Sequence, residues 1–397
     1  MQKIVIEGME NKMKKRLAII GSGEMAVIIA ENAKKMDIET HSFSNNMNDR
    51  VMGYSDCHHN IDIFDINSLV NACRELNVAG VIPTTELTIS IAAKVAALLD
   101  LNGMPVDVAE KVTDKGFVRE KIVGNAYIKQ PHFVLYERDD EIPKVDKYPV
   151  VVKPTAMGGK RGVSVANNQE ELKKAIDFAI DNMPNEKRRI IIEGFLEGGK
   201  EYSVESLSYH GRHQVIQITE KITSGPPHCV ELGHMQPALL SESLKRKIDI
   251  AIGELLSIVG IDNTTSHTEI KIIDDEIYLI ELNARSGGDH IAYPLTELST
   301  GYPYIQGAIE IAINEHKFPK LDKYTKRNCG VLFVVKQTAF LKQLFDKCED
   351  YSWLYKKNFI TEELQEIVHN EAFDTNYMMY LTEEGIPKEI EDSLKLF

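Results

Sequence analysis

The chain has 397 residues, which at roughly 100–200 residues per domain predicts two or three domains with ample core. Hydrophobic residues make up 43% of the chain and charged residues 27%, as in ordinary soluble globular proteins. The formal net charge of −14 disfavours general binding to nucleic acid or to an anionic membrane, because such a surface repels phosphate groups.

The five cysteines are odd in number and form no C-x-x-C pair, which indicates reduced thiols and a cytoplasmic location. Cys57, His58 and His59 are neighbouring metal-ligand types, but no second cluster completes a zinc site. No apolar run approaches the about 18 residues that span a bilayer, and Glu7 and Glu10 interrupt the N-terminal segment. We therefore expect a protein that neither crosses a membrane nor is exported.

The N-terminal region alternates strands with helices after a basic extension. The elements expected here are strands at Leu17–Ile20, Glu39–Phe43 and Ala79–Pro83, and helices from Glu24 to about Met36, at Ala92–Leu99 and at Ala109–Val123, the last opened by Asp107 as a cap. This alternation predicts a parallel, doubly wound α/β sheet.

From Tyr148 the pattern changes to short strands joined by glycine turns, which indicates an α+β region. The strands expected are Val150–Lys153, Gly162–Ala166, Arg189–Glu193, Glu201–Tyr209, His213–Thr219, Thr265–Ile273 and Ile277–Glu281, with helices at Gln169–Asn182, Glu242–Val259 and Tyr304–Asn314. Beyond Phe318 we expect a β-rich run at Gly330–Val335 and helical segments near Leu341–Cys348, Glu362–His369 and Lys388–Leu396.

The turn Gly21-Ser-Gly23-Glu-Met-Ala26 follows the first strand with the spacing of a dinucleotide-binding turn. Such a site needs an acidic residue for the ribose about 20 residues later, where this chain has Ser42, Ser44 and Asn45. We therefore favour a tight turn without a cofactor. An NAD-binding oxidoreductase is the weaker alternative.

A pair of carboxylates is the strongest chemical signal. The segment Thr265–Arg285 predicts a hairpin that turns at Asp274-Asp-Glu276. Counting outward from Asp275 gives three opposed pairs on one face: Glu269 with Glu281, His267 with Asn283, and Thr265 with Arg285. Opposed carboxylates repel unless a cation bridges them, and such oxygen ligands suit Mg²⁺ shared with phosphates. The alternative is a solvated hairpin face.

Phosphate contacts are indicated upstream of this hairpin. Lys153 ends an apolar strand, where an ammonium group needs an anionic partner. The turn Met157-Gly-Gly-Lys-Arg-Gly162 follows, and its glycines let backbone amides approach phosphate oxygens. It lacks the Walker spacing, so an ordinary hairpin is the alternative. Further on, the run Ile190–Tyr202 is either a strand pair with a polar bend or a connection that reads an adenine edge, with Glu201 accepting ribose hydroxyls.

With these motifs in this order, residues 17–316 resemble the ATP-grasp superfamily, and within it the carboxylate-amine ligases that include L-amino acid ligases and carbamoyl-phosphate-synthase-like proteins. The resemblance implies a Rossmann-like N-terminal domain without a dinucleotide (1–112), a central ATP-grasp domain (113–316) with a mobile lid at about 148–209, and a small C-terminal α+β region (317–397). Nucleotide is then expected between two antiparallel sheets.

The resemblance also implies roles for individual residues. Those expected at ATP are Lys115, Lys153, Gly158, Gly159, Gly162, Glu193, Phe195, Leu196 and Glu201, and those expected at magnesium are Glu269, Glu281 and Asn283. Those expected near the substrates are Arg285, which meets the transferred phosphate, Gly287, Gly288, Asp289 and His290 at the start of a helix, and Glu231 and His234 in a loop that ends at Pro237. For both histidines an ordinary polar-loop role is the alternative, and the tail beyond Phe318 departs most from relatives.

The chemistry that the resemblance implies begins with phosphorylation of a carboxylate, because an amine cannot displace oxide. ATP would give an acyl phosphate, and amine attack would release an amide, ADP and phosphate. Mg²⁺, with Mn²⁺ as the alternative ion, would stabilise the moving group together with Lys153 and Arg285, while a closed lid excludes water. His267 and His234 are candidate bases by residue type alone.

Two other functions stay open. A biotin carboxylase-like or purine-pathway enzyme would activate bicarbonate or formate instead of an amino acid. A regulator would bind ATP without any transfer. For the favoured ligase we expect a small-molecule carboxylate and an amine as partners, without nucleic acid or membrane. The oligomeric state is open, with a homodimer as the commonest assembly of soluble enzymes.

Overall fold

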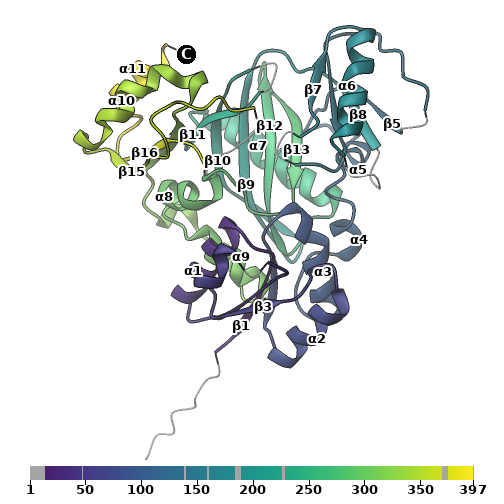
Figure 1. Ribbon diagram of the computed structural model, residues 1–397, viewed down its shortest axis with the longest axis vertical. Coiled ribbons are helices and arrows are strands. Elements are labelled where there is room, and N and C mark those ends of the chain that lie inside the picture. The colour runs from purple at the N-terminus through teal and green to yellow at the C-terminus, as the bar shows by residue number, and fades with distance from the viewer. Residues whose placement is uncertain are drawn as a thin grey trace, which may run out of the picture.

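The computed structural model describes residues 14–46, 48–137, 140–158, 161–183, 189–225, 229–368 and 374–396. These residues form three lobes around a central sheet (Figure 1). In this described part of the chain, no helix is both long enough and apolar enough to cross a membrane.

The N-terminal lobe contains a parallel sheet with strand order β3-β2-β1-β4. Its elements are β1 (Arg16–Ile20), α1 (Glu24–Lys35), β2 (Glu39–Ser44), β3 (Cys57–Asn60), α2 (Ile66–Leu76), β4 (Gly80–Pro83) and α3 (Ile89–Leu98). Leu17 and Ile19 pack on the α1 side, whereas Ala18 and Ile20 pack on the side of α2 and α3. Helices thus cover both faces, which confirms the predicted doubly wound sheet.

The glycine turn after β1 has a packing reason for its first residue. Gly21 has φ 103°, and a Cβ there would lie 2.4 Å from Thr84 Oγ1 at the end of β4. A side chain at this position is therefore excluded by the neighbouring strand. This close approach is consistent with the tight turn that we favour from the sequence.

A second, small antiparallel sheet has strand order β5-β8-β6-β7. Its elements are β5 (Phe133–Glu137), β6 (Val150–Pro154), β7 (Ser164–Ala166), α6 (Gln169–Asp181) and β8 (Arg189–Gly194). Ile190 and Ile192 pack against Leu172 and Ile176 of α6. Because side chains alternate along a strand, Glu193 projects from the face away from α6.

The central sheet is antiparallel and has eight strands in the order β13-β12-β9-β10-β11-β14-β16-β15. The strands are β9 (Lys200–Tyr209), β10 (Arg212–Thr223), β11 (Glu231–Gln236), β12 (Thr264–Ile273), β13 (Glu276–Asn283), β14 (Asn328–Phe333), β15 (Leu354–Asn358) and β16 (Tyr377–Thr382). Helix α7 (Glu242–Val259) packs Ile252 and Leu255 against Val204 and Ile270 of this sheet.

Shorter helices complete the described chain. They are α4 (Val106–Ala109), α5 (Lys115–Lys121), α8 (Thr296–Thr300), α9 (Tyr304–Ala312), α10 (Lys342–Lys347) and α11 (Lys388–Leu394), with short 3₁₀ or π segments at η1 (Arg50–Gly53), η2 (Glu86–Thr88), η3 (Ile291–Leu295), η4 (Leu321–Lys323), η5 (Lys336–Leu341) and η6 (Cys348–Asp350).

Two predicted helices are wrong. The expected helix at Ala109–Val123 is broken, because α4 ends at Ala109 and Asp114 caps α5 by accepting from the backbone N–H groups of Gly116 and Phe117. Residues 362–368 form no helix, and His369 lies outside the described residues. The backbone carbonyl of Gln365 accepts from Lys336 and that of Ile367 from Gln337, so these groups bind another segment instead of a helical turn.

Candidate active site

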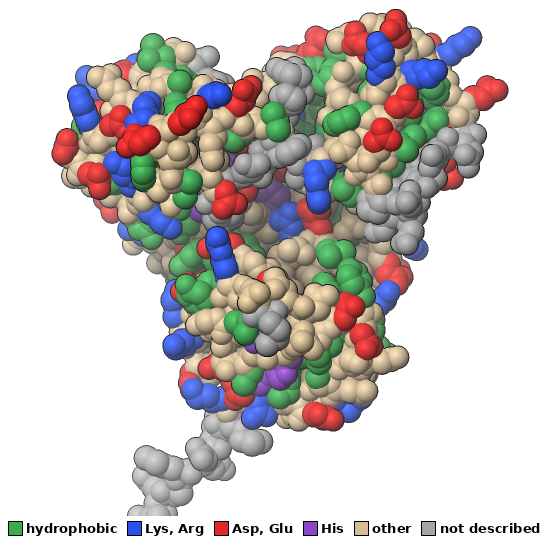
Figure 2. Space-filling view, in the orientation of Figure 1, with side chains coloured by type: hydrophobic (Ala, Val, Ile, Leu, Met, Phe, Trp, Pro, Cys, Tyr) green, Lys and Arg blue, Asp and Glu red, His purple; other side chains and the backbone are tan. Residues whose placement is uncertain are grey.

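Two adjoining cavities lie in the hollow between the lobes, where charged and histidine side chains gather in Figure 2. The inter-sheet cavity, of about 160 Å³, is lined from the small sheet by Lys153 and Glu193 and from the central sheet by Glu269 and Glu281. The acidic cavity, of about 210 Å³, is lined by Glu86, Glu231, His267, Glu269, Glu281, Asn283, Arg285, Gly288, Asp289 and Ile291. Glu269 and Glu281 line both cavities, so the carboxylate pair stands where they meet.

The hairpin that carries this pair has the predicted pairings of Glu269 with Glu281 and His267 with Asn283. The turn itself differs, because Asp274 and Asp275 both have positive φ and form a two-residue turn. A register shift next to Glu269 then restores the predicted pairing by one residue. The third predicted pair, Thr265 with Arg285, lies beyond the end of β13 at Asn283.

Three cations compensate the pair, two from other elements and one, His267, from β12 itself. Lys221 Nζ lies 3.1 Å from Glu269, His267 Nε2 lies 3.4 Å from the same carboxylate, and Lys115 Nζ lies 3.1 Å from Glu281. Burial alone would raise the pKa of Glu269, but Lys221 and His267 hold it well below its usual range. Glu269 is therefore ionised, and its ligand oxygens are available at neutral pH.

Lys153 receives its anionic partner from the protein itself. Its Nζ lies 2.5 Å from Glu193, whose other oxygen accepts from Arg119 Nε at 2.6 Å. Burial would raise the pKa of Glu193, but Lys153 and then Arg119 lower that pKa to about 2. Burial lowers the pKa of Lys153, which Glu193 only partly offsets. Arg119 also donates to the carbonyl of Ile280 at 2.8 Å, so this network joins α5, β6, β8 and β13.

The connection after β8 contributes Phe195 and Leu196 to the lining of the inter-sheet cavity. Lys271 of β12 donates to the Leu196 carbonyl at 2.8 Å and lies 3.7 Å from Glu201, its neighbour on β9. Lys271 also lies 5.8 Å from the centre of the Phe195 ring. Glu201 is thus held at the cavity edge by a cation across the strand.

The glycine turn after β6 approaches both cavities through its first residues. Met157 lines the inter-sheet cavity, and its carbonyl accepts from Lys115 at 2.9 Å. A Cβ on Gly158 would lie 2.4 Å from Glu86 Oε2, so the backbone here passes directly over that carboxylate. Gly162 has φ 70° but does not line either cavity. Gly159 lies outside the described residues.

In the acidic cavity, Arg285 pairs with Glu86 at 2.6 Å. Burial would lower the pKa of Arg285, but Glu86 raises it, so the guanidinium stays charged. Glu231 lies 2.7 Å from Lys221 and 3.2 Å from His234 Nε2. Burial and the Glu231 charge raise the pKa of Asp289.

His267 is an imidazolium in this arrangement. Its Nδ1 hydrogen-bonds Glu205, and the backbone N–H of Gly287 donates to the other Glu205 oxygen at 3.1 Å. Burial would lower the pKa of His267, but Glu205 and Glu269 raise it to about 9. A group that already carries its proton at neutral pH is a donor and not an acceptor.

Some predicted substrate residues do not reach either cavity. The segment expected as a loop, Glu231–Pro237, contains strand β11, in which His234 is completely buried. His290 is also buried, with its ring 4.6 Å from that of Tyr377. Neither histidine is therefore an exposed loop residue, and neither lines the acidic cavity.

Five charged residues of the site were not predicted from the sequence: Glu86, Arg119, Glu205, Lys221 and Lys271. Local spacing carried a signal for two of them. Arg119 follows Lys115 by one helical turn and so shares its face, and Lys271 follows His267 and Glu269 with the period of a strand. Glu86, Glu205 and Lys221 reach the site only through the folding of distant elements.

The comparisons with known proteins agree with this geometry. Residues 146–293 match the family model described as "ATP-grasp domain". A D-alanine–D-alanine ligase of Campylobacter concisus is 27% identical over 210 residues, which are 49% of this chain and 57% of that protein. The C-terminal section of the carbamoyl phosphate synthase large chain of Aquifex aeolicus is 25% identical over 235 residues, 56% of this chain and 42% of that one. The chain thus spans about half of the length of these curated relatives.

Solved structures extend the likeness to the whole fold. The L-amino acid ligase from Bacillus licheniformis superposes with a TM-score of 0.78 at 21% identity, over 96% of each chain. At this identity the match shows the fold alone, and it includes the three-lobed arrangement described above. Residues 146–293 of the chain thus match an ATP-grasp domain, and nearly the whole chain has the same fold as this ligase.

Proposed function

We propose that this protein is an ATP-dependent ligase that joins a carboxylate, an amino acid, to an amine through an acyl phosphate, releasing ADP and phosphate. The observation that carries the proposal is the position of Glu269 and Glu281 at the junction of the two cavities. One cavity has a buried lysine and an apolar connection suited to a nucleotide. The other has a separate set of charges suited to a small substrate.

The residues present fit a divalent ion. Glu269, Glu281 and Asn283 offer carboxylate and amide oxygens on neighbouring positions of one hairpin, the ligand type that Mg²⁺ prefers. Bound there, Mg²⁺ or Mn²⁺ would neutralise phosphate charge. Within the protein itself, Lys115 compensates the negative charge of Glu281, and Lys221 compensates that of Glu269.

The remaining charges suit the phosphoryl group. Lys153 and Lys115 face the inter-sheet cavity and bind phosphate oxygens in the proposal, while Arg285 faces the acidic cavity and receives the transferred group. His267, charged at neutral pH, adds positive charge beside Glu269 and does not act as a base. A free amine substrate supplies its own nucleophile once it is neutral, so the proposal assigns no protein base.

An amino acid fits the acidic cavity because of its mixture of charges. Arg285 can hold the carboxylate that is to be activated, and Glu86, Glu231 and Asp289 can hold an ammonium group. Bicarbonate and formate carry no ammonium group and would make no contact of this kind with the carboxylates of the cavity. The mixture of charges in the acidic cavity therefore favours an amino acid over bicarbonate or formate as the substrate.

The test is a panel of amino-acid pairs, with bicarbonate and formate as further arms, incubated with the full chain, ATP and Mg²⁺. We expect ADP and phosphate in equal amounts with amide for at least one pair. AMP with pyrophosphate would contradict the acyl phosphate route. Turnover with bicarbonate or formate alone would indicate the alternative acids, and tight ATP binding without turnover in every arm would indicate a regulator.

A further inference from the structure

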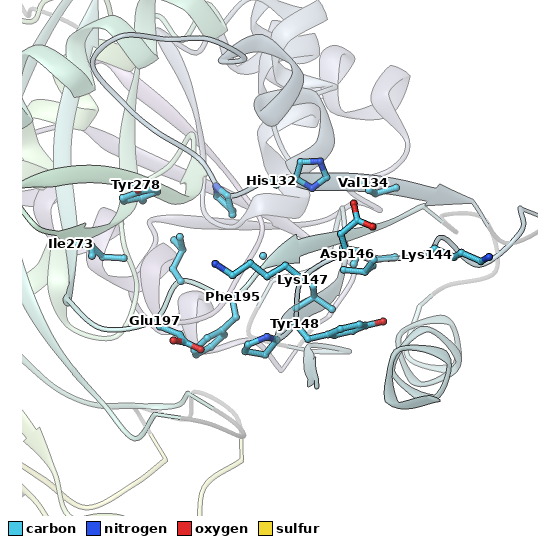
Figure 3. Close-up of a pocket in the computed structure, with 17 residues that line it drawn as sticks. His132, Val134, Lys144, Asp146, Lys147, Tyr148, Phe195, Glu197, Ile273 and Tyr278 are labelled. Atoms are coloured by element: carbon cyan, nitrogen blue, oxygen red, sulfur yellow. The ribbon is translucent and has the colours of Figure 1, made fainter. Parts of the chain in front are cut away.

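A third cavity, here called the rear cavity, lies behind the connection that follows β8 (Figure 3). Its volume is about 510 Å³, within the range of about 300–1,000 Å³ that is usual for small-molecule sites. It is formed by residues 131, 132, 134 and 144–150, by Ile192 and 194–197, and by Ile273 and Tyr278. Of these residues, only Phe195 and Leu196 were given a role from the sequence, and that role was at ATP.

The rear cavity and the inter-sheet cavity lie on opposite faces of the small sheet. Ile192 and Glu193 are consecutive residues of β8, so their side chains point to opposite faces. Ile192 lines the rear cavity, and Glu193 lines the inter-sheet cavity with Lys153. An occupant of the rear cavity would therefore not touch the nucleotide directly.

The two cavities nevertheless share one wall. Gly194, Phe195 and Leu196 line both of them. The backbone N–H of Gly194 donates to the His132 carbonyl at 2.9 Å, and that of Phe195 donates to the Pro149 carbonyl at 3.0 Å. Because His132 and Pro149 also line the rear cavity, an occupant there presses on the residues that hold the shared wall.

The rear cavity also spans two separate parts of the fold. Val134, Val150 and Ile192 belong to the small sheet, whereas Ile273 and Tyr278 belong to the β12–β13 hairpin that carries the carboxylate pair. The small sheet and the hairpin can be arranged differently relative to one another, and a ligand that contacts both of them stabilises the arrangement to which it binds best. By linkage, such a ligand alters affinity for a second ligand held between the same parts.

The lining indicates the chemistry of the ligand. Most of the lining side chains are aliphatic or aromatic, which favours an apolar body. Figure 3 shows the Lys147 side chain extending across the pocket, whereas the end of Lys144 points away from it. The carboxylates of Asp146 and Glu197 also line the cavity, but among the described residues no acidic side chain forms an ion pair with Lys147. The exposed ammonium group of Lys147 is therefore available for an anion.

We propose that the rear cavity binds a small amphipathic anion, with an apolar body against Val134, Ile192 and Tyr278 and one anionic group at Lys147, and that this binding changes nucleotide affinity in the inter-sheet cavity.

The test uses anilinonaphthalene sulfonate, a fluorescent probe with an aromatic body and a single sulfonate. The probe is titrated into the full chain with saturating ADP and Mg²⁺, which occupy the nucleotide cavity. Lys147→Glu reverses the charge, and Val134→Trp fills the cavity. Lys173→Glu, on the exposed side of α6, is the matched control for charge. Circular dichroism and thermal unfolding verify that each variant is folded.

We expect the probe to bind in the presence of nucleotide, at least fivefold more weakly to Lys147→Glu and to Val134→Trp, and within twofold of wild type to Lys173→Glu. In the reverse titration, ADP affinity should shift to a plateau as the probe saturates. Unchanged binding to both cavity variants would overturn the proposal. So would an ADP shift that grows without limit, since that is competition for one site, and so would the absence of any shift.

Discussion

Gly287 lies in the segment that follows β13, against the His267–Glu205 pair. A Cβ at this position would lie 2.6 Å from His267 Nδ1 and 2.7 Å from Glu205 Oε1, whereas a Cβ on the next residue, Gly288, would meet nothing within 4 Å. We expect Gly287→Ala to lower the free energy of unfolding by about 1–3 kcal/mol, as overpacking does. Gly288→Ala should stay within about 0.5 kcal/mol of wild type.

Urea unfolding of the two glycine variants measures this difference. Neither substitution changes charge, so the pair isolates the effect of the contact. Equal stability of the two variants would show that the His267–Glu205 pair moves aside without cost. The backbone at Gly287 would then not fix the position of that pair.

The carboxylate pair gives a prediction that depends on the proposed function. Glu281→Gln keeps the shape of the side chain but removes a negative ligand, and it leaves Lys115 without its ion-pair partner. We expect a loss of about 10²–10³-fold in kcat, the size found when one preorganised electrostatic group is removed, with a higher Mg²⁺ requirement. Phosphate release at varied Mg²⁺ measures both.

Glu276→Gln is the control for that substitution, because Glu276 begins the same strand but is exposed and pairs with Lys129 at the far end of the hairpin. It should retain activity close to wild type. If Glu281→Gln kept full turnover at every Mg²⁺ concentration, Glu281 would have to be removed from the proposed ligand set.

At the scale of single residues, sequence spacing predicts what lies along one element. Lys153, Glu269, Glu281 and Asn283 were predicted from strand ends and from the period of a hairpin, and the structure brings them to the two cavities. Their partners could not be predicted in this way. Lys221 approaches Glu269 from β10, and no local pattern records which strand lies beside which.

Between elements, Glu193 is the central link of the small sheet, since it binds Lys153 of β6 and Arg119 of α5. Its pKa in the folded protein is about 2, below the usual value of 4.5. Its contribution to stability is thus fully present above about pH 4.5 and is lost as the pH falls toward 2. We expect the stability difference between wild type and Glu193→Gln to shrink by on the order of 2 kcal/mol between pH 6 and pH 3.

Urea unfolding at several pH values, without nucleotide or metal, measures this difference. Glu137→Gln, at the exposed end of β5 in the same sheet, is the matched control for loss of one carboxylate. A constant difference between wild type and Glu193→Gln from pH 6 to pH 3 would contradict the prediction, because it would mean that Glu193 titrates normally in the folded protein.

Several elements were missed for identifiable reasons. Strand β3 consists of Cys57-His-His-Asn60 and has no apolar period, and its histidines bind strand β2: His58 to Ser42 at 2.9 Å and His59 to His41 at 3.0 Å. Helix α2 carried a signal that was not used, because Asp65 caps it and Leu69, Val70 and Cys73 form its buried face. The hairpin register, by contrast, was predicted correctly at the carboxylates because the shorter turn and the register shift compensate.

On the scale of the whole molecule, the central sheet crosses the boundary predicted at residue 317. Strand β14 pairs with β11 from Gly233 with Leu332 to Gln236 with Cys329, and β16 and β15 continue the sheet. The sequence could not show this, because sheet order is set by pairing between segments almost 100 residues apart. The limits 1–112, 113–316 and 317–397 remain predictions, and the third region shares its sheet with the second.

This shared sheet predicts the effect of shortening the chain. A chain of residues 1–317 would expose the edge of β11 from Gly233 to Gln236, and it would also uncover Leu295, which packs against Val331, Phe333 and Met379. An unpaired edge beside exposed apolar surface favours association between molecules. We expect this chain to elute as aggregates in size-exclusion chromatography and to lack a cooperative thermal transition.

A chain that ends at residue 387 is the control. It loses α11 but keeps every strand of the central sheet. It should therefore stay folded, with reduced stability because the buried Ile390 is lost. If the 1–317 chain were monodisperse and unfolded cooperatively, the C-terminal strands would be an attachment to a self-sufficient sheet, and the boundary at 317 would separate two independent folding units.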